Sequence, residues 1–238
     1  MMLRILERDP QTSVYGEFSQ LSIGPGRTLF KPFDQVKSII DRDPAPFAVL
    51  KPLVETQRLS ELFRYFPQAK AVWMYRHYKD VISSNLINFG RSNGVDDLRP
   101  IAQGDPANWR SSHASDEVKR VARHYFSENM PALDAAALFW YARNSLYFDM
   151  DLPNHAQVMI SRYEDMVHDP RTQLREIYRF VGQPFPEAIL NHRIKSSSVG
   201  KGKHAQINPE IEQLCQSMLT RLDNAYDKTT SSSLRTAR

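Results

Sequence analysis

Short apolar segments alternate with helical segments along the 238-residue chain, and this alternation constrains the fold more than any other feature. Segments of this kind, bordered by turn residues, are typical of strands that are covered on both faces. They lie at residues 14–16, 47–50, 71–75 and 158–161. Strands that are separated by helices usually pair in parallel within one sheet. The sequence therefore predicts an α/β fold in which a parallel sheet lies between two layers of helices.

Helical periodicity fills the intervals between these strands. Helices are predicted from apolar spacing, proline and glycine at residues 53–66, 80–89, 117–152 with a break at Pro131, 170–181 and 209–226. We interpret residues 115–152 as a helical insertion over the sheet. Residues 1–227 form a single predicted domain, because one core of this size is the usual solution for such a length. The polar residues from Lys228 onward predict a disordered tail over 228–238.

The bulk composition excludes several classes of protein. The net charge is +4, from 31 basic and 27 acidic residues, a surplus too small to indicate a nucleic-acid partner. The single cysteine, Cys215, cannot form an internal disulfide, and no cysteine–histidine spacing predicts a metal site. No apolar run is long enough for a signal peptide or a membrane span. These features favour a cytoplasmic protein without a membrane partner, and its oligomeric state stays open.

The segment at residues 66–84 carries the chemistry of the chain, because it runs from a strand through a turn into a helix. It places Arg76 at the carboxyl end of the strand, where open α/β sheets bind ligands. The guanidinium group is permanently charged and matches a phosphate, and Ser84, about two turns into the helix, adds a hydroxyl. These two residues predict a phosphate clamp. We expect Asp80 to cap the helix or to pair with Arg76, which is a structural role.

This segment resembles the phosphate-binding segment of the sulfotransferase family. In that family an arginine, an aspartate four residues later and a serine eight residues later follow a buried strand, and the arginine and serine bind the 3′-phosphate of the donor. Arg76, Asp80 and Ser84 match, although Tyr78 stands where the family often has proline. The resemblance implies a P-loop-like sulfotransferase fold and 3′-phosphoadenosine 5′-phosphosulfate (PAPS) as co-substrate, without a metal.

Two further segments match the family in the same order along the chain. Residues 161–170 are similar to its Tyr-Glu-Asp-Leu segment, whose tyrosine lies near the adenine, so Tyr163 is implied to contact the nucleotide. Residues 195–203 resemble its basic loop with glycines, which closes over the nucleotide phosphates. Lys201 and Lys203 are therefore the implied lysine contacts. The resemblance covers about residues 1–225.

One part of the family pattern has no counterpart in this chain. Family members begin with a strand and a loop rich in Gly, Ser and Thr, which holds the 5′-phosphosulfate. Residues 1–10 resemble the helix that follows this loop, and we interpret the glycines at 24–28 as a plain turn. We expect that the start codon was assigned downstream of the true one, or that the chain is a natural remnant.

Sulfuryl transfer needs a base that takes the acceptor's proton. Some family members use a histidine after a Lys-Thr motif, and Lys51 occupies the corresponding strand end without such a histidine. Others use a glutamate in a Gly-Glu context, which Glu17 resembles. We therefore predict Glu17 as the base and Glu55 as the reserve, with Lys51 near the sulfonate or the acceptor.

The favoured function is transfer of a sulfuryl group from PAPS to a hydroxyl or amine. The alternative is a non-catalytic sulfotransferase-like remnant that binds a nucleotide or a partner. A nucleotide kinase is disfavoured, because the chain has no phosphate-loop motif with Gly-Lys-Ser/Thr. A small-molecule acceptor, a glycan and a peptide tyrosine all stay open, since the loops at 18–33 and 88–115 carry no readable code.

Overall fold

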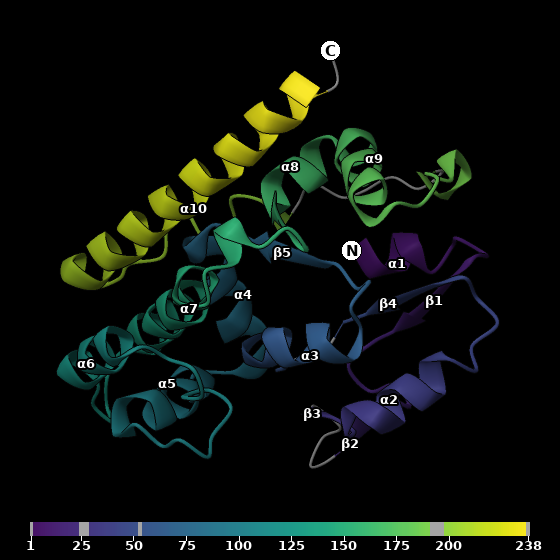
Figure 1. The fold of residues 1–238 in the computed structure, drawn as a ribbon. Coiled ribbons are helices and arrows are strands. Elements are labelled where there is room, and N and C mark those ends of the chain that lie inside the picture. The colour runs from purple at the N-terminus through teal and green to yellow at the C-terminus, as the bar shows by residue number, and fades with distance from the viewer. Residues whose placement is uncertain (1, 24–28, 52–53, 191–197, 237–238) are drawn as a thin grey trace. The chain divides into compact units, whose positions relative to one another are not determined.

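The computed structural model describes residues 2–23, 29–51, 54–190 and 198–236 of the chain (Figure 1). Its contacts divide the chain into two compact units: residues 1–69 with 183–194, and residues 70–182 with 195–238. Three predicted features lie outside the described residues, namely the turn at 24–28, the start of the helix at Leu53 and the first part of the 195–203 loop. The single domain through residue 227 stays a prediction.

The first unit contains a parallel pair of strands. Strand β1 (Thr12–Tyr15) pairs with β4 (Phe47–Leu50), with Thr12 opposite Phe47 and Tyr15 opposite Leu50. The short strands β2 (Ser22–Ile23) and β3 (Leu29–Phe30) are antiparallel. The remaining elements are α1 (Met2–Leu6), α2 (Phe33–Ile40), η2 (Thr56–Arg58), α3 (Leu59–Tyr65) and η4 (Glu187–Leu190). The core of this unit is built from Tyr15, Leu21, Phe30, Phe33 and Val36.

The second unit contains the other parallel pair. Strand β5 (Ala71–Tyr75) pairs with β6 (Val158–Arg162), and Tyr75 lies opposite Arg162. The other elements are α4 (Tyr78–Phe89), α5 (Asn93–Gln103), α6 (Asp116–Tyr125), α7 (Ala132–Asp149), η3 (Leu152–Asn154), α8 (Tyr163–His168), α9 (Pro170–Val181) and α10 (Pro209–Thr236). Helix α7 packs against α4, α5 and α10, and α10 also contacts β6 (Figure 1).

The helix boundaries follow from local chemistry. Helix α6 ends at Tyr125, and α7 begins directly after Pro131, which is its N-cap residue. Asp169 caps α9, because its side chain accepts a hydrogen bond from the Thr172 N–H at 3.2 Å. That helix ends at Gly182, whose φ of +76° favours glycine. The predicted break at Pro131 and the predicted bounds of the helix at 170–181 are confirmed.

The structure confirms the α/β class and all four predicted strands, which it pairs two by two. It differs from the sequence prediction in the tail, because α10 continues to Thr236 where we expected disorder from Lys228. Extending an existing helix needs no new nucleus, so a run of threonine and serine need not end it. None of the helices in the described ranges is long and apolar enough to cross a membrane.

Helices α5 and α7 approach each other closely at Gly94. A β-carbon at this position would lie 2.8 Å from the Ala136 nitrogen and 3.1 Å from the Ala132 carbonyl oxygen. Both atoms belong to the backbone of α7, so they cannot rotate away as the end of a side chain would. The contact between these two helices therefore requires glycine.

We expect Gly94→Ala to lower the free energy of unfolding by about 1–3 kcal/mol, the usual cost of overpacking. The better helix propensity of alanine, about 1 kcal/mol, offsets only part of this cost. Urea unfolding followed by circular dichroism measures the change. Gly16→Ala is the control, because a β-carbon at Gly16 has no other atom within 4 Å. Equal stability of the two variants would contradict the close contact.

Candidate functional site

Arg76 lies at the carboxyl end of the parallel pair in the second unit. It directly follows β5, and Tyr163 directly follows β6. Because Tyr75 and Arg162 are opposite each other in the register, the residues that follow them reach the same edge of the pair. This edge is the usual ligand-binding edge of a parallel sheet. The structure thus brings together Arg76 and Tyr163, which the sequence predicted separately.

The guanidinium group of Arg76 makes three contacts. Its Cζ atom lies 4.7 Å from the centroid of the Tyr163 ring, within the range of a cation–π interaction. Its Nη2 atom lies 3.4 Å from Oδ2 of Asp80 and donates a hydrogen bond to the carbonyl oxygen of Ser198. Its Nε atom is buried and has no hydrogen-bond partner among the described residues. A buried donor of this kind is costly unless an acceptor arrives, and an oxyanion would supply one.

Asp80 attaches the segment at 198–203 to the start of α4. Its buried carboxylate accepts hydrogen bonds from the Gly200 N–H at 2.8 Å and the Gly202 N–H at 2.7 Å. Burial raises the pKa of Asp80, but these two N–H groups and the Arg76 charge outweigh it, so the pKa lies below its ordinary value. Gly202 also needs to be glycine, because a β-carbon there would lie 1.9 Å from the Lys79 carbonyl oxygen.

The same segment contacts Tyr163 and exposes its lysines. The hydroxyl groups of Tyr163 and Ser198 lie 2.9 Å apart, within hydrogen-bond distance. Lys201 and Lys203 are exposed. Their side chains are therefore accessible to an anion in solution.

Ser84 lies on α4, where the sequence placed it. Its hydroxyl oxygen accepts a hydrogen bond from Nδ2 of Asn88 at 3.1 Å. The hydroxyl proton can still be donated to a ligand, because a hydroxyl both donates and accepts.

The predicted catalytic residues lie in the first unit. The Glu17 carboxylate forms an ion pair with the Lys51 ammonium group, which follows β4. Partial burial lowers the pKa of Lys51, while the adjacent carboxylate favours its charged form. Glu55 is buried, and its oxygens accept hydrogen bonds from the Phe30 N–H at 2.5 Å and from Arg58 at 3.1 Å.

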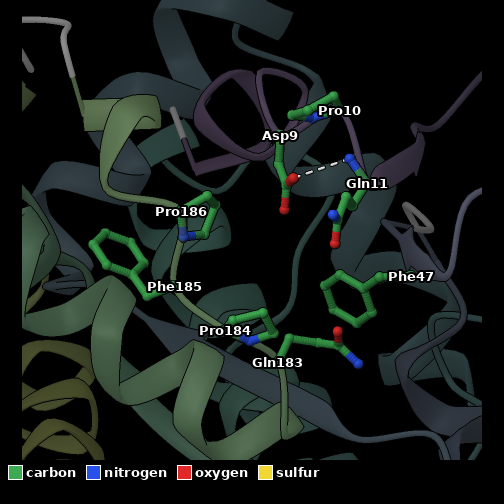
Figure 2. Close-up of a pocket in the computed structure, with 8 residues that line it drawn as sticks. All are labelled: Asp9, Pro10, Gln11, Phe47, Gln183, Pro184, Phe185 and Pro186. Carbon is green, nitrogen blue, oxygen red and sulfur yellow. Dashed lines mark hydrogen bonds between the residues drawn. The ribbon is translucent and has the colours of Figure 1, made fainter.

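A hollow of about 190 Å³ in the first unit contains none of the predicted site residues. Its wall is formed by Asp9, Pro10, Gln11, Phe47, Gln183, Pro184, Phe185 and Pro186 (Figure 2). The Asp9 carboxylate accepts the Gln11 N–H at 3.0 Å beside this hollow. A carboxylate and apolar rings do not suit a phosphate, so the hollow is not an anion site. Within the described ranges, no group of three histidine, cysteine or acidic side chains is placed to hold a metal ion.

The sequence predicted the role of Asp80 only in part. The predicted ion pair with Arg76 is present, but His77 rather than Asp80 caps α4, since its Nδ1 accepts the Lys79 N–H at 3.2 Å. Sequence reasoning missed that Asp80 binds Gly200 and Gly202. The two glycines flanking Lys201 were the available signal, because closely spaced backbone N–H groups can surround an anion.

Comparisons with known proteins identify a family and a fold. A sequence model described as the sulfotransferase family matches residues 27–187. Among solved structures, the chain is similar to the sulfotransferase domain from the curacin biosynthetic pathway, with 16% identity and a TM-score of 0.52 over 79% of this chain and 67% of that one. It is also similar to a sulfotransferase from Alicyclobacillus acidocaldarius, with 13% identity and a TM-score of 0.51 over 96% and 89% of the two chains. No curated protein matches. At these identities the structural likeness shows the fold.

We expect Asp80→Ala to release the segment at 198–203, because hydrogen bonds to a charged group stabilise by about 1.5–3 kcal/mol. Cleavage by trypsin after Lys201 and Lys203, followed by mass spectrometry, should become at least about tenfold faster. The control is Asp41→Ala, which removes a carboxylate from an exposed i,i+4 pair with Lys37. Unchanged cleavage in Asp80→Ala would contradict the attachment.

Proposed function

Because the chain belongs to the sulfotransferase family, we propose that it transfers a sulfuryl group from PAPS to a hydroxyl or amine acceptor. The observation that carries this proposal is the buried Nε donor of Arg76 at the carboxyl end of β5, which has no hydrogen-bond partner among the described residues. A dianionic 3′-phosphate would satisfy that donor and the charge of the guanidinium together. The acceptor class is a small molecule or a glycan.

The residues of the second unit fit the nucleotide end of the donor. In the proposal, Arg76 and Ser84 bind the 3′-phosphate, and the ring of Tyr163 contacts the adenine. Lys201 and Lys203 add positive charge near the phosphates. The described contacts support this assignment, because Tyr163 already stacks on Arg76 and bonds to Ser198 of the loop.

When bound, PAPS supplies the sulfuryl group and a phosphate leaving group. Glu17 accepts the proton of the acceptor's hydroxyl or amine at its carboxylate oxygen, which makes the acceptor a stronger nucleophile. Lys51 pairs with Glu17 and adds positive charge for the sulfonate oxygens. In this proposal the acceptor attacks the sulfur atom of PAPS directly, so no covalent intermediate forms on the protein.

Glu17 suits the role of base better than Glu55. The Glu55 carboxylate is buried and binds both the Phe30 N–H and Arg58, so its oxygens already have partners. Its removal would leave a buried backbone donor unsatisfied, which is a structural loss. Glu17 is partly exposed, with 26% of its side chain accessible, so an acceptor can reach it.

We expect Arg76→Ala to raise the Kd for adenosine 3′,5′-bisphosphate about 10- to 100-fold, because it removes charge-assisted hydrogen bonds to the 3′-phosphate. The Kd for adenosine 5′-monophosphate should change little, since that ligand has no 3′-phosphate. Isothermal titration calorimetry measures both values. The control, Arg120→Ala, removes the same charge from an exposed arginine. Unchanged affinity in Arg76→Ala would disprove the clamp.

We expect Glu17→Gln to lower the rate of sulfuryl transfer at least about 100-fold, the usual contribution of a general base. Binding of adenosine 3′,5′-bisphosphate should stay the same. Transfer is measured with ³⁵S-labelled PAPS and the acceptor that the wild type modifies fastest from a panel of alcohols, phenols, amines and glycans. Glu55→Gln is the comparison. It should lower the melting temperature and leave the rate of sulfuryl transfer by the folded protein close to the wild-type value. The opposite pattern would assign the base to Glu55.

A further inference from the structure

The peptide group that joins Arg76 to His77 lies in the short connection between β5 and α4. Its carbonyl oxygen, on Arg76, accepts a hydrogen bond from Nε1 of Trp140 at 3.1 Å. Its N–H, on His77, donates to Oε1 of Glu164 at 3.0 Å. Side chains from α7 and α8 therefore bind both polar groups of one peptide.

We propose that Trp140 and Glu164 are positioning residues for Arg76. They fix the peptide from which the Arg76 side chain leaves, and so determine how well the guanidinium meets the 3′-phosphate. The inference rests on the proposed function of Arg76, but it assigns two residues that do not themselves touch the nucleotide.

A connection between two elements can change its backbone dihedral angles more easily when its peptide groups are not bound. Neither the β5–β6 pairing nor the hydrogen bonds of α4 include the Arg76 carbonyl and the His77 N–H that Trp140 and Glu164 bind. A shift of this connection relative to α7 and α8 would carry the Arg76 side chain with it, because the bound peptide directly adjoins the Arg76 Cα atom. Binding groups need to be held within about 0.5 Å and 10–20° to keep their affinity, so two opposed hydrogen bonds are an effective restraint.

The two positioning residues have different surroundings. Trp140 is only 5% exposed, and its ring packs on Tyr78 with the centroids 5.6 Å apart. Glu164 adjoins Tyr163, whose ring stacks on the Arg76 guanidinium. The first turn of α8 therefore contacts the Arg76 guanidinium through Tyr163 and the N–H of the next residue, His77, through Glu164. This arrangement links the 3′-phosphate contact to the residue that the family resemblance places near the adenine.

A ratio of two affinities distinguishes a role in positioning Arg76 from an effect on the stability of the whole protein. The ratio of the Kd for adenosine 5′-monophosphate to that for adenosine 3′,5′-bisphosphate reports only on the 3′-phosphate. Trp140→Phe removes the indole donor and keeps an aromatic ring, and Glu164→Ala removes the acceptor. We expect each to reduce the ratio about fivefold, the value of one hydrogen bond. Glu164→Gln should restore the ratio to within about twofold, because its amide oxygen still accepts the His77 N–H.

Trp109→Phe is the matched control for loss of a tryptophan, because Trp109 contacts Phe139 and Arg110 rather than Arg76. It should leave the ratio unchanged. A loss of overall stability would weaken the binding of both nucleotides and leave their ratio constant. A wild-type ratio in Trp140→Phe and Glu164→Ala would therefore overturn the proposal.

Hydrogen exchange of the His77 amide, followed by NMR, distinguishes failure of this inference from failure of the proposed function. Glu164→Ala should speed this exchange at least about tenfold, with or without nucleotide, since it frees the amide. Glu164→Gln should retain the protection. A wild type that binds both nucleotides equally well would disprove the proposed function. Hydrogen exchange of the His77 amide would then be the remaining test of the positioning role. An unchanged exchange rate in Glu164→Ala overturns the positioning role in either case.

Discussion

The parallel pairing of β5 with β6 is the interaction on which the candidate site depends. Its register sets Tyr75 opposite Arg162, so the next residues, Arg76 and Tyr163, leave the strands at the same edge. Those two residues are separated by the whole of α4 to α7 in the chain. A slip of one residue in the pairing would turn one of them to the other face. The cation–π contact between them is therefore a consequence of backbone hydrogen bonds.

The sequence predicted the parts of the site that depend on local order. A buried strand followed by a helix locates Arg76, whereas the resemblance of residues 161–170 to the family segment implied Tyr163. The sequence could not predict the partners of Asp80, because Gly200 and Gly202 lie about 120 residues away and are joined to it only by tertiary packing. Helix α5 was missed for a related reason. It begins with Asn93 and Gly94, poor helix formers, and Gly94 is favourable there only because α7 packs on it.

The electrostatics of the site depend on Arg76 in two ways. A buried carboxylate is costly without compensation, and Asp80 receives its compensation from two loop N–H groups and from Arg76. The same arginine has an Nε donor that no described residue uses. One guanidinium thus neutralises a structural acid and keeps a donor for an anion, which a lysine, with no planar fork, could not do in the same geometry.

The contact between Arg76 and the Ser198 carbonyl has a consequence for ligand affinity. That oxygen is an acceptor inside the protein, so it competes with any external anion for the same Nη2 donor. The apparent affinity of a ligand then equals its intrinsic affinity multiplied by the fraction of molecules in which the Ser198 carbonyl has left Arg76. Substitutions that loosen the Ser198 segment would accordingly strengthen the binding of an anion that contacts Arg76 alone. They would weaken the binding of a nucleotide that also needs the segment, so one loop would have opposite effects on small and large ligands.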